Sequence, residues 1–179
     1  MTVEAHIPLA DELLAAWKTE IGNDYLGYKN HVYRLLHFCF ALHTCNPEER
    51  EKLIIAGCFH DLGIWANGTF DYLAPSIALA KAYVEKIHRE QWMPEIERMI
   101  DMHHRIRTYQ DERYPLVEVF RKADWIDVSF GILAYGLPRT YIQRVKAQFP
   151  DAGFHKRLVQ LTGERFARHP FSPIPVLKW

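Results

Sequence analysis

The chain has 179 residues, of which 49% are hydrophobic, which is enough for one domain with a sizeable core. Its 22 Lys and Arg balance 22 Asp and Glu, and a formal net charge of +0 argues against a general electrostatic affinity for nucleic acid polymers or anionic membranes. No uncharged apolar run approaches the roughly 20 residues of a membrane span. Residues 1–9 lack a signal-peptide pattern, and the 3 cysteines lack a paired metal-site spacing. We therefore expect one cytoplasmic domain over residues 1–179, whose 10 histidines need a chemical explanation.

Most of the chain has apolar residues at helical spacing, interrupted by Gly and Pro signals. Pro47, followed by glutamates, predicts a helix start, because proline suits the first helical position and negative charge suits a helix N-terminus. Asn67-Gly68 is a turn signal, so we expect an irregular loop over residues 64–74. Strand-like alternation is scarce, which predicts an all-α bundle with short connections. The expected helices cover residues 10–21, 25–45, 47–63, 75–90, 94–104, 116–128, 139–149 and 153–168.

The His60-Asp61 pair follows an apolar run over residues 54–59, which is typical of a buried helix. Neighbouring side chains inside a helix point about 100° apart and do not normally share a ligand. The helix is expected to end near Gly63, and the released backbone there lets both side chains turn toward one point. A buried Asp is costly unless it is paired or bound to a cation. The pair therefore indicates a candidate metal ligand set.

His31 and Asp124 also lie among apolar residues of expected helices. Taken singly, each has a simpler interpretation. His31 fits a core histidine with one hydrogen bond, and Asp124 fits a salt bridge to Arg121. Their order along the chain, together with His60-Asp61 and a later histidine pair, is more informative than any one position.

This ordered set resembles the HD-domain superfamily of metal-dependent phosphohydrolases. The matching segments are Lys29-Asn30-His31-Val32-Tyr33-Arg34, His60-Asp61-Leu62-Gly63, Ile100-Asp101-Met102-His103-His104 and Ala123-Asp124-Trp125-Ile126-Asp127. The resemblance runs from about Tyr25 to Gly131, which is over half of the chain. It implies an all-α, single-domain helical bundle of the HD-domain type, with a core at about 25–131 and C-terminal helices and a tail at 139–179.

The resemblance also implies one divalent metal ion, because the family uses the first His, the His-Asp pair and the late Asp as its ligands. Such a mixed set of imidazoles and carboxylates suits Mn, Fe, Co, Ni, Zn or Mg, and ligand types alone do not choose among them. A metal there would lower the pKa of a bound water and polarise a phosphoryl oxygen. Asp61 would coordinate the metal and hold that water. The implied metal ligands are His31, His60, Asp61 and Asp124.

The sequence departs from the family pattern in two places. Members with two metals carry a further histidine after the His-Asp loop, where this chain has Ser76, and His88 lies too far along the helix to replace it. We therefore favour one metal, which leaves His103 to contact the leaving phosphate or act in acid–base catalysis. Some nucleotide-cleaving members carry a glutamate where this chain has Ile64, so the general base is not evident.

Arg34 follows His31 by one helical turn, and its guanidinium suits a substrate phosphate, although a surface ion pair is equally compatible. His104 is the second expected substrate contact, although cations at a helix C-terminus also serve stability alone. The aromatic loop at 64–72 is compatible with a lid or with a plug of the core. The apolar tail at 171–179 is compatible with packing on the bundle or on another subunit, so a homo-oligomer stays open.

We expect a hydrolase acting on a small phosphorylated molecule, a phosphomonoester or a nucleotide, through a metal-activated water. Two alternatives remain. The first is an HD-fold di-iron oxygenase or a non-phosphate hydrolase or lyase, for which the missing histidine at Ser76 is unfavourable. The second is a non-catalytic metal- or nucleotide-binding module, which retained ligands do not exclude.

Overall fold

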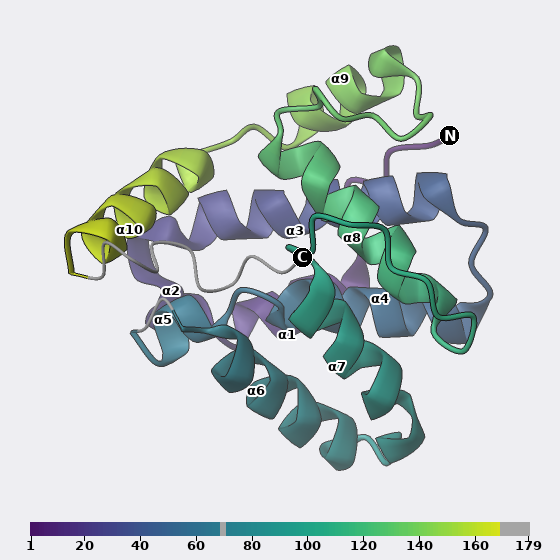
Figure 1. Cartoon of the computed structure of the whole chain (residues 1–179), viewed down its shortest axis with the longest axis horizontal. Coiled ribbons are helices and arrows are strands. Elements are labelled where there is room, and N and C mark those ends of the chain that lie inside the picture. Colours follow the sequence, from purple (N-terminus) through teal and green to yellow (C-terminus); the bar gives the residue numbers. More distant parts are fainter. Residues whose placement is uncertain (69–70, 169–179) are drawn as a thin grey trace.

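The computed structural model describes residues 1–68 and 71–168, and all regular secondary structure among them is helical. This confirms the prediction of an all-α chain, whose arrangement is drawn in Figure 1. The elements are α1 (Pro8–Ala15), α2 (Lys18–Ile21), η1 (Gly22–Asp24), α3 (Tyr25–Leu42), α4 (Pro47–Phe59), α5 (Gly63–Ala66), α6 (Leu73–Lys86), η2 (Glu90–Trp92), α7 (Met93–Met102), α8 (Pro115–Val128), α9 (Arg139–Gln148) and α10 (Phe154–Arg168).

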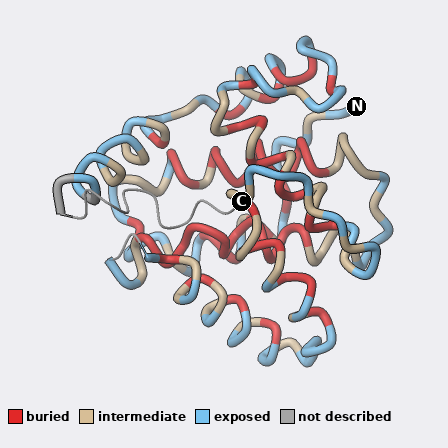
Figure 2. The backbone as a smooth tube through the Cα atoms, in the orientation of Figure 1, coloured by how far each residue is buried: buried red, intermediate tan, exposed pale blue. Residues whose placement is uncertain are grey.

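The central element is α3, which crosses the middle of the molecule and packs against α8, α4, α9 and α10 (Figure 1). A helix that is covered by neighbours on most sides must be apolar around most of its circumference. Every residue from 30 to 39 is buried, and most of them are apolar, as this position requires. Figure 2 shows the same concentration of burial along the middle of the molecule. Polar side chains that α3 carries are therefore enclosed in the core.

The start of α4 is fixed by local chemistry, as its sequence predicts. Asn46 Oδ1 accepts a hydrogen bond from the Glu49 backbone N–H at 3.0 Å, and the Glu49 side chain accepts one from the Asn46 N–H at 2.9 Å. This reciprocal capping box, with Pro47 at the first turn, satisfies N–H groups that a helix end would leave free. The cap sets where α4 begins, and therefore where its far end delivers His60 and Asp61.

Two local predictions were wrong. Residues 10–21 form α1 and α2 rather than one helix, with the break at Ala16 and Trp17, and nothing in the local sequence marks that break. Residues 63–66 form the short α5 inside the expected loop. Its start is tied to α6, because Gly63 N–H donates to Ser76 Oγ at 3.0 Å. A Cβ on Gly63 would lie only 2.6 Å from the carbonyl oxygen of Tyr72, so this close approach requires glycine.

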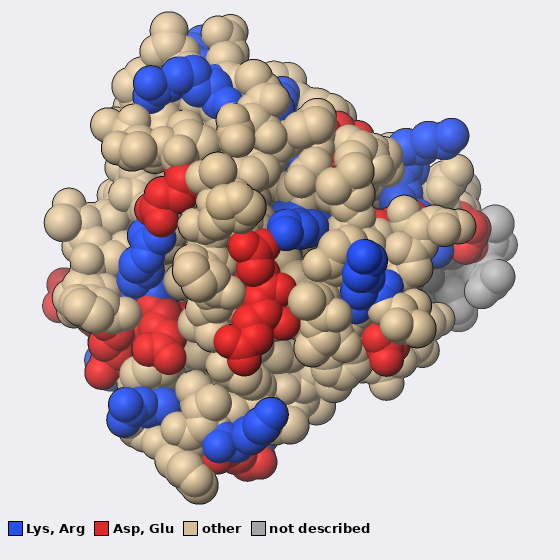
Figure 3. All heavy atoms as spheres, turned by 180° about the vertical axis from the view of Figure 1, so that it is seen from behind, with Lys and Arg blue, Asp and Glu red and all other residues tan. Residues whose placement is uncertain are grey.

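One large cluster of buried apolar side chains extends from Ile7 to Phe154 and joins most of the helices, and a small second cluster contains Ile64 and Tyr72. Among the described residues, none of the helices combines the length and the apolar character that crossing a membrane requires. Figure 3 shows acidic and basic side chains interspersed on one face of the molecule, without an extended basic field on that face. The apolar tail at 171–179 lies outside the described residues.

Candidate metal centre

Four separate segments deliver His and Asp side chains to one place inside the bundle. His31 comes from α3, His60 and Asp61 from the turn after α4, a histidine pair from the end of α7, and Asp124 from α8. His31, His60, Asp61, His103 and Asp124 are all buried. The structure therefore brings together the residues that the sequence motifs single out, and it places them where unpartnered polar groups are costly.

In the turn after α4, two adjacent side chains face the same point. His60 continues the helix with a backbone bond to Ala56, and the chain then tightens, with Leu62 N–H donating to the Phe59 carbonyl at 3.1 Å. Such i to i+3 bonds wind the last turn more tightly than an α-helix. Tighter winding alone does not bring neighbouring residues to one side, so the side chains themselves must bend toward one point, and His60 Nε2 and Asp61 Oδ2 lie 3.3 Å apart.

His31 and His60 meet with their Nε2 atoms 3.0 Å apart. The other nitrogen of each ring faces an acceptor: His60 Nδ1 lies 2.8 Å from the Gly57 carbonyl, and His31 Nδ1 lies 2.7 Å from Asp127 Oδ2. A carbonyl and a carboxylate only accept, so each Nδ1 carries the hydrogen. Each Nε2 of a neutral ring then presents a lone pair to the other, an arrangement that needs a positive charge between or beside them.

Unpartnered carboxylate oxygens surround the same point. Asp61 Oδ2 lies 3.8 Å from His31 Nε2, and Asp124 Oδ1 lies 3.7 Å from the same nitrogen. Among the described residues, Asp61 Oδ1 and both carboxylate oxygens of Asp124 have no hydrogen-bond partner, although they are buried. Buried polar atoms in folded proteins are nearly always satisfied. A bound cation would satisfy these oxygens and the facing lone pairs together.

The ionisation of Asp61 and His31 suits cation binding. Burial lowers the pKa of His60, but Asp61 and Asp124 outweigh burial and leave that pKa raised, so a proton on His60 competes with a cation. Burial raises the pKa of the Asp61 carboxyl, but His60 and His103 outweigh it and hold that pKa well below its usual range. Burial lowers the pKa of His31 in spite of the nearby Asp127. Burial raises the pKa of Asp124, which its neighbouring histidines only partly oppose. Metal ligands must be deprotonated, and an anionic Asp61 beside a neutral His31 is already in that form at neutral pH.

A second group of potential ligands shares Asp61 with the first. It consists of Asp61, His103 and His104, just as the first consists of His31, His60 and Asp61. His103 Nδ1 donates to the Ile100 carbonyl at 2.6 Å, and its Nε2 lies 3.5 Å from Asp61 Oδ1 with no hydrogen bond among the described residues. The cluster can therefore hold a cation on either side of Asp61. The prediction of a single metal rested on Ser76, which lies outside both groups and bonds to Gly63.

Arg34 does not lie where the sequence interpretation expects a substrate contact. Its side chain is buried, with Nε donating to Asp127 Oδ1 at 2.6 Å and Nη2 donating to Asp127 Oδ2 at 2.8 Å. Nη1 donates to the carbonyls of Phe149 and Pro150 at 3.0 and 3.3 Å. The guanidinium nitrogens of Arg34 thus already donate to acceptors within the protein. Arg34 orients the carboxylate that holds His31, which is a positioning role rather than a phosphate contact.

The simpler interpretation of Asp124 as a partner of Arg121 is wrong. Arg121 donates to Glu118 instead, with Nε to Oε2 and Nη2 to Oε1 both at 2.7 Å. Arg121 Nη1 also donates to the Arg105 carbonyl at 3.1 Å. Arg121 thereby links α8 to the segment that connects α7 with α8. Asp124 is left facing the histidines.

His104 and the loop before α6 approach the cluster from its outer side. His104 Nδ1 lies 3.5 Å from Asp124 Oδ2, and its Nε2 lies 2.9 Å from the Tyr72 hydroxyl. Trp65, in α5 of the expected loop, packs against Tyr28 and donates to Asp24, so it plugs the core rather than forming a lid. Residues 69 and 70 of the expected lid lie outside the described residues.

Two contacts of the cluster had no clear signal in the sequence. Phe154, at the start of α10, stacks on the His31 ring with centroids 4.0 Å apart. Asp127 follows Asp124 in the last motif, and the sequence predicts no role for it. Its carboxylate accepts hydrogen bonds from both His31 and Arg34. An acidic residue one helical turn after a candidate ligand was the only available hint for Asp127.

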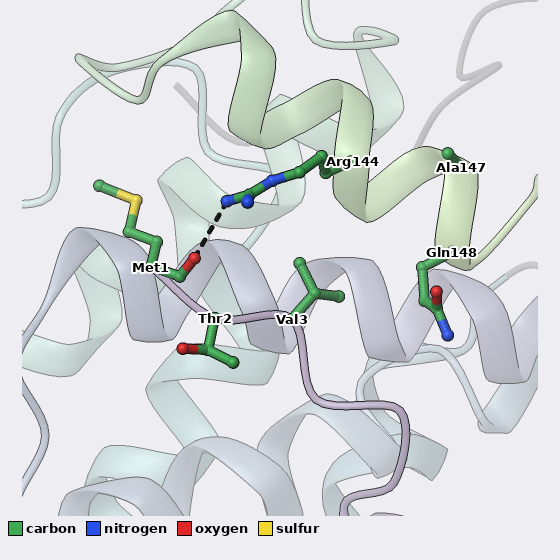
Figure 4. Close-up of a pocket in the computed structure, with 6 residues that line it drawn as sticks. All are labelled: Met1, Thr2, Val3, Arg144, Ala147 and Gln148. Carbon is green, nitrogen blue, oxygen red and sulfur yellow. Dashed lines mark hydrogen bonds between the residues drawn. The ribbon is translucent and has the colours of Figure 1, made fainter.

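The open cavity beside the N-terminus lacks this chemistry. The cavity of about 540 Å³ beside the N-terminus is lined by Met1, Thr2, Val3, Arg144, Ala147 and Gln148. Arg144 donates there to the Met1 carbonyl at 3.0 Å, as Figure 4 shows. It contains no carboxylate, histidine or cysteine. Comparisons with protein-family models, curated proteins and solved structures find no match to this chain, so the His and Asp cluster is the observation from which a function must be argued.

Proposed function

We propose that this chain is a metal-dependent phosphohydrolase of the HD-domain type that acts on a small phosphomonoester, nucleotides included. The observation that carries the proposal is the buried meeting of His31, His60, Asp61 and Asp124, whose facing lone pairs and unpartnered oxygens call for a cation. These are the residues that the sequence resemblance implies as ligands, and the structure supports it independently, through side-chain geometry.

The donor set fits a divalent first-row metal, because it combines imidazole nitrogens with carboxylate oxygens. When bound, such a cation supplies a water of lowered pKa and a positive charge beside a phosphoryl oxygen. The chain itself contributes orientation. Asp127 fixes the His31 tautomer, the Gly57 carbonyl fixes that of His60, and both Nε2 atoms are thereby presented as ligands.

His103 is the best placed group for proton transfer. Its Nδ1 is engaged by the Ile100 carbonyl, so only Nε2 can accept or release a proton at the cluster. That nitrogen lies 3.5 Å from Asp61 Oδ1, within reach of a group bound at Asp61. We infer that His103 acts on the water or on the leaving oxygen. His104, held by Tyr72, is the proposed phosphate contact at the outer side.

One observation favours a variant of this function with two cations, since Asp61 belongs to both ligand groups. The same arrangement is the feature that keeps the di-iron oxygenase alternative open. Phosphate release and O₂ consumption separate these alternatives. A hydrolase releases phosphate without consuming O₂, whereas the oxygenase requires iron and consumes O₂ with its substrate.

The test is to load the metal-free protein with each candidate metal in turn and to screen a panel of phosphomonoesters and nucleotides for phosphate release. We expect release with at least one metal, and we expect Asp61→Asn to abolish both metal retention and release. Asp111→Asn, a change to a loop carboxylate bonded to Arg113, serves as the matched control and should retain both metal binding and phosphate release. Metal-loaded protein that binds nucleotides but releases no phosphate would show a binding module and contradict the proposal.

A further inference from the structure

The loop between α8 and α9, residues 129–138, displays large apolar side chains to solvent. Phe130, Ile132, Leu133 and Tyr135 are 56%, 73%, 41% and 37% exposed. Phe130 and Tyr135 also have positive φ values of 57° and 45°, a region that bulky residues avoid. The loop and α9 form one edge of the molecule (Figure 1). Contiguous exposed apolar side chains on a strained backbone indicate an interaction surface.

The loop is held in this conformation by basic side chains of α9. Lys146 Nζ donates to the Phe130 carbonyl at 3.1 Å, and Arg139 Nη1 donates to the Gly131 carbonyl at 3.0 Å. Gly131, with a φ of 81°, packs so closely on α9 that an added Cβ would lie 2.9 Å from Ile142. The apolar side chains are therefore presented by a fixed scaffold.

A small cationic cavity lies directly beside Phe130 of this loop. Its volume is about 160 Å³, and Phe130, Gly131, Arg139, Ile142, Gln143 and Lys146 line it. Neither Arg139 nor Lys146 forms an ion pair with a carboxylate among residues 1–68 and 71–168, and each retains donors beyond those that bond the loop. Residues 128–150 contain Arg139, Arg144 and Lys146 but no Asp or Glu, so this edge is basic although the whole chain is neutral.

We propose that this edge binds the phosphate headgroup of an anionic phospholipid at a membrane surface. The cavity between Arg139 and Lys146 would take the phosphate, and Ile132 and Leu133 would enter the boundary with the acyl chains. A ligand with an anionic head beside an apolar tail matches both halves of the surface, and basic residues near a membrane strengthen such binding. A two-fold contact between copies through this edge is disfavoured, because it would bring their uncompensated cations together.

The electrostatic half is tested with vesicles of phosphatidylcholine alone and of phosphatidylcholine mixed with phosphatidylglycerol, sedimented with the full chain. We expect the protein to sediment with the anionic vesicles only. Gln143→Glu places a negative charge in the cavity without removing a loop contact and should weaken binding by about fivefold or more. Gln148→Glu, on the same helix but at the cavity drawn in Figure 4, should leave binding unchanged.

The apolar half has its own matched pair of variants. Ile132 and Val159 are 73% and 72% exposed, and neither is held in the core. Ile132→Ser should weaken binding to anionic vesicles, whereas Val159→Ser on α10 should not. If Val159→Ser and Ile132→Ser weaken binding equally, the loop is not the insertion site and the proposal fails.

Three other results would overturn the proposal. The first is an absence of binding to either vesicle. The second is binding of inorganic phosphate, sensed by amide NMR shifts at Gln143, without any binding to vesicles, which would indicate a site for free anions. The third is a dimer in light scattering that Ile132→Ser dissociates while vesicle binding is absent, which would indicate a contact between copies. None of these readouts depends on the proposed metal site.

Discussion

His31 Nε2 and His60 Nε2 face each other 3.0 Å apart in the core, each with its other ring nitrogen bonded to an acceptor. A cation beside them removes this repulsion, so divalent metal should stabilise the folded chain. At a free metal concentration of 100 times the Kd, the gain in unfolding free energy is about 2.7 kcal/mol. Thermal unfolding with and without metal measures the gain. His60→Ala should abolish it, and His6→Ala, at an exposed position, should not.

Arg34 should affect metal binding without touching the metal. Arg34→Lys keeps the charge but loses the two parallel bonds to Asp127, so we expect the free energy of unfolding to fall by about 1–3 kcal/mol. Because Asp127 then holds His31 less firmly, metal affinity should fall by about tenfold or more. Denaturant unfolding and metal titration measure the two effects.

An exposed pair of the same geometry provides the control for Arg34. Arg113 donates to both oxygens of Asp111 but is solvent-exposed, so Arg113→Lys should leave both the unfolding free energy and metal affinity nearly unchanged. Equal effects of the two substitutions would show that burial and the link to His31 contribute nothing.

His103 should matter for turnover more than for folding. His103→Ala removes the ring nitrogen that we propose moves a proton beside Asp61, and kcat for phosphate release should fall by about 10² to 10⁴. Circular dichroism should show unchanged helix content, and His6→Ala should retain full kcat. An unchanged kcat in His103→Ala would assign proton transfer to another residue.

Glu118 gives a prediction for acid stability. Burial raises the pKa of the Glu118 carboxyl, but hydrogen bonds from Arg121 and from the Tyr109 backbone N–H outweigh it and leave that pKa lowered. A lowered carboxyl pKa contributes stability above the unfolded value of about 4.3, and this contribution is lost as the pH falls. Glu118→Gln should therefore lose less stability on acidification than the wild type does, by under about 1 kcal/mol because solvent screens the pair.

Glu97→Gln, on the exposed face of α7, is the control for acid unfolding and should follow the wild-type curve. Urea unfolding at a series of pH values from neutral to acidic measures all three proteins. A Glu118→Gln curve parallel to that of the wild type would mean that Arg121 does not depend on this carboxylate.

Local sequence rules predicted much of the fold and part of the candidate metal centre. The Asn46-Pro47 start of α4 and the apolar run before His60 depend on neighbouring residues, so spacing and residue type suffice to place them. The meeting of His31 with His60 could be anticipated only through the order of motifs, because no local rule relates residues on different helices.

Long-range partners could not be predicted from local patterns. Helix spacing placed Arg34 beside His31, and both do contact the same carboxylate, but that carboxylate is Asp127 on a distant helix. Without this partner, Arg34 resembled a solvent-facing phosphate contact. The short α5 was missed for the same reason, since it depends on the close approach of Gly63 to the start of α6.

We propose that one divalent cation is held by His31, His60, Asp61 and Asp124. Anomalous diffraction from metal-loaded crystals, collected at the absorption edge of the loaded metal, tests it most directly. We predict an anomalous peak about 2–2.3 Å from both His31 Nε2 and His60 Nε2, with carboxylate oxygens of Asp61 and Asp124 completing the shell. Metal-saturated crystals whose peaks all lie away from these four side chains would contradict the account.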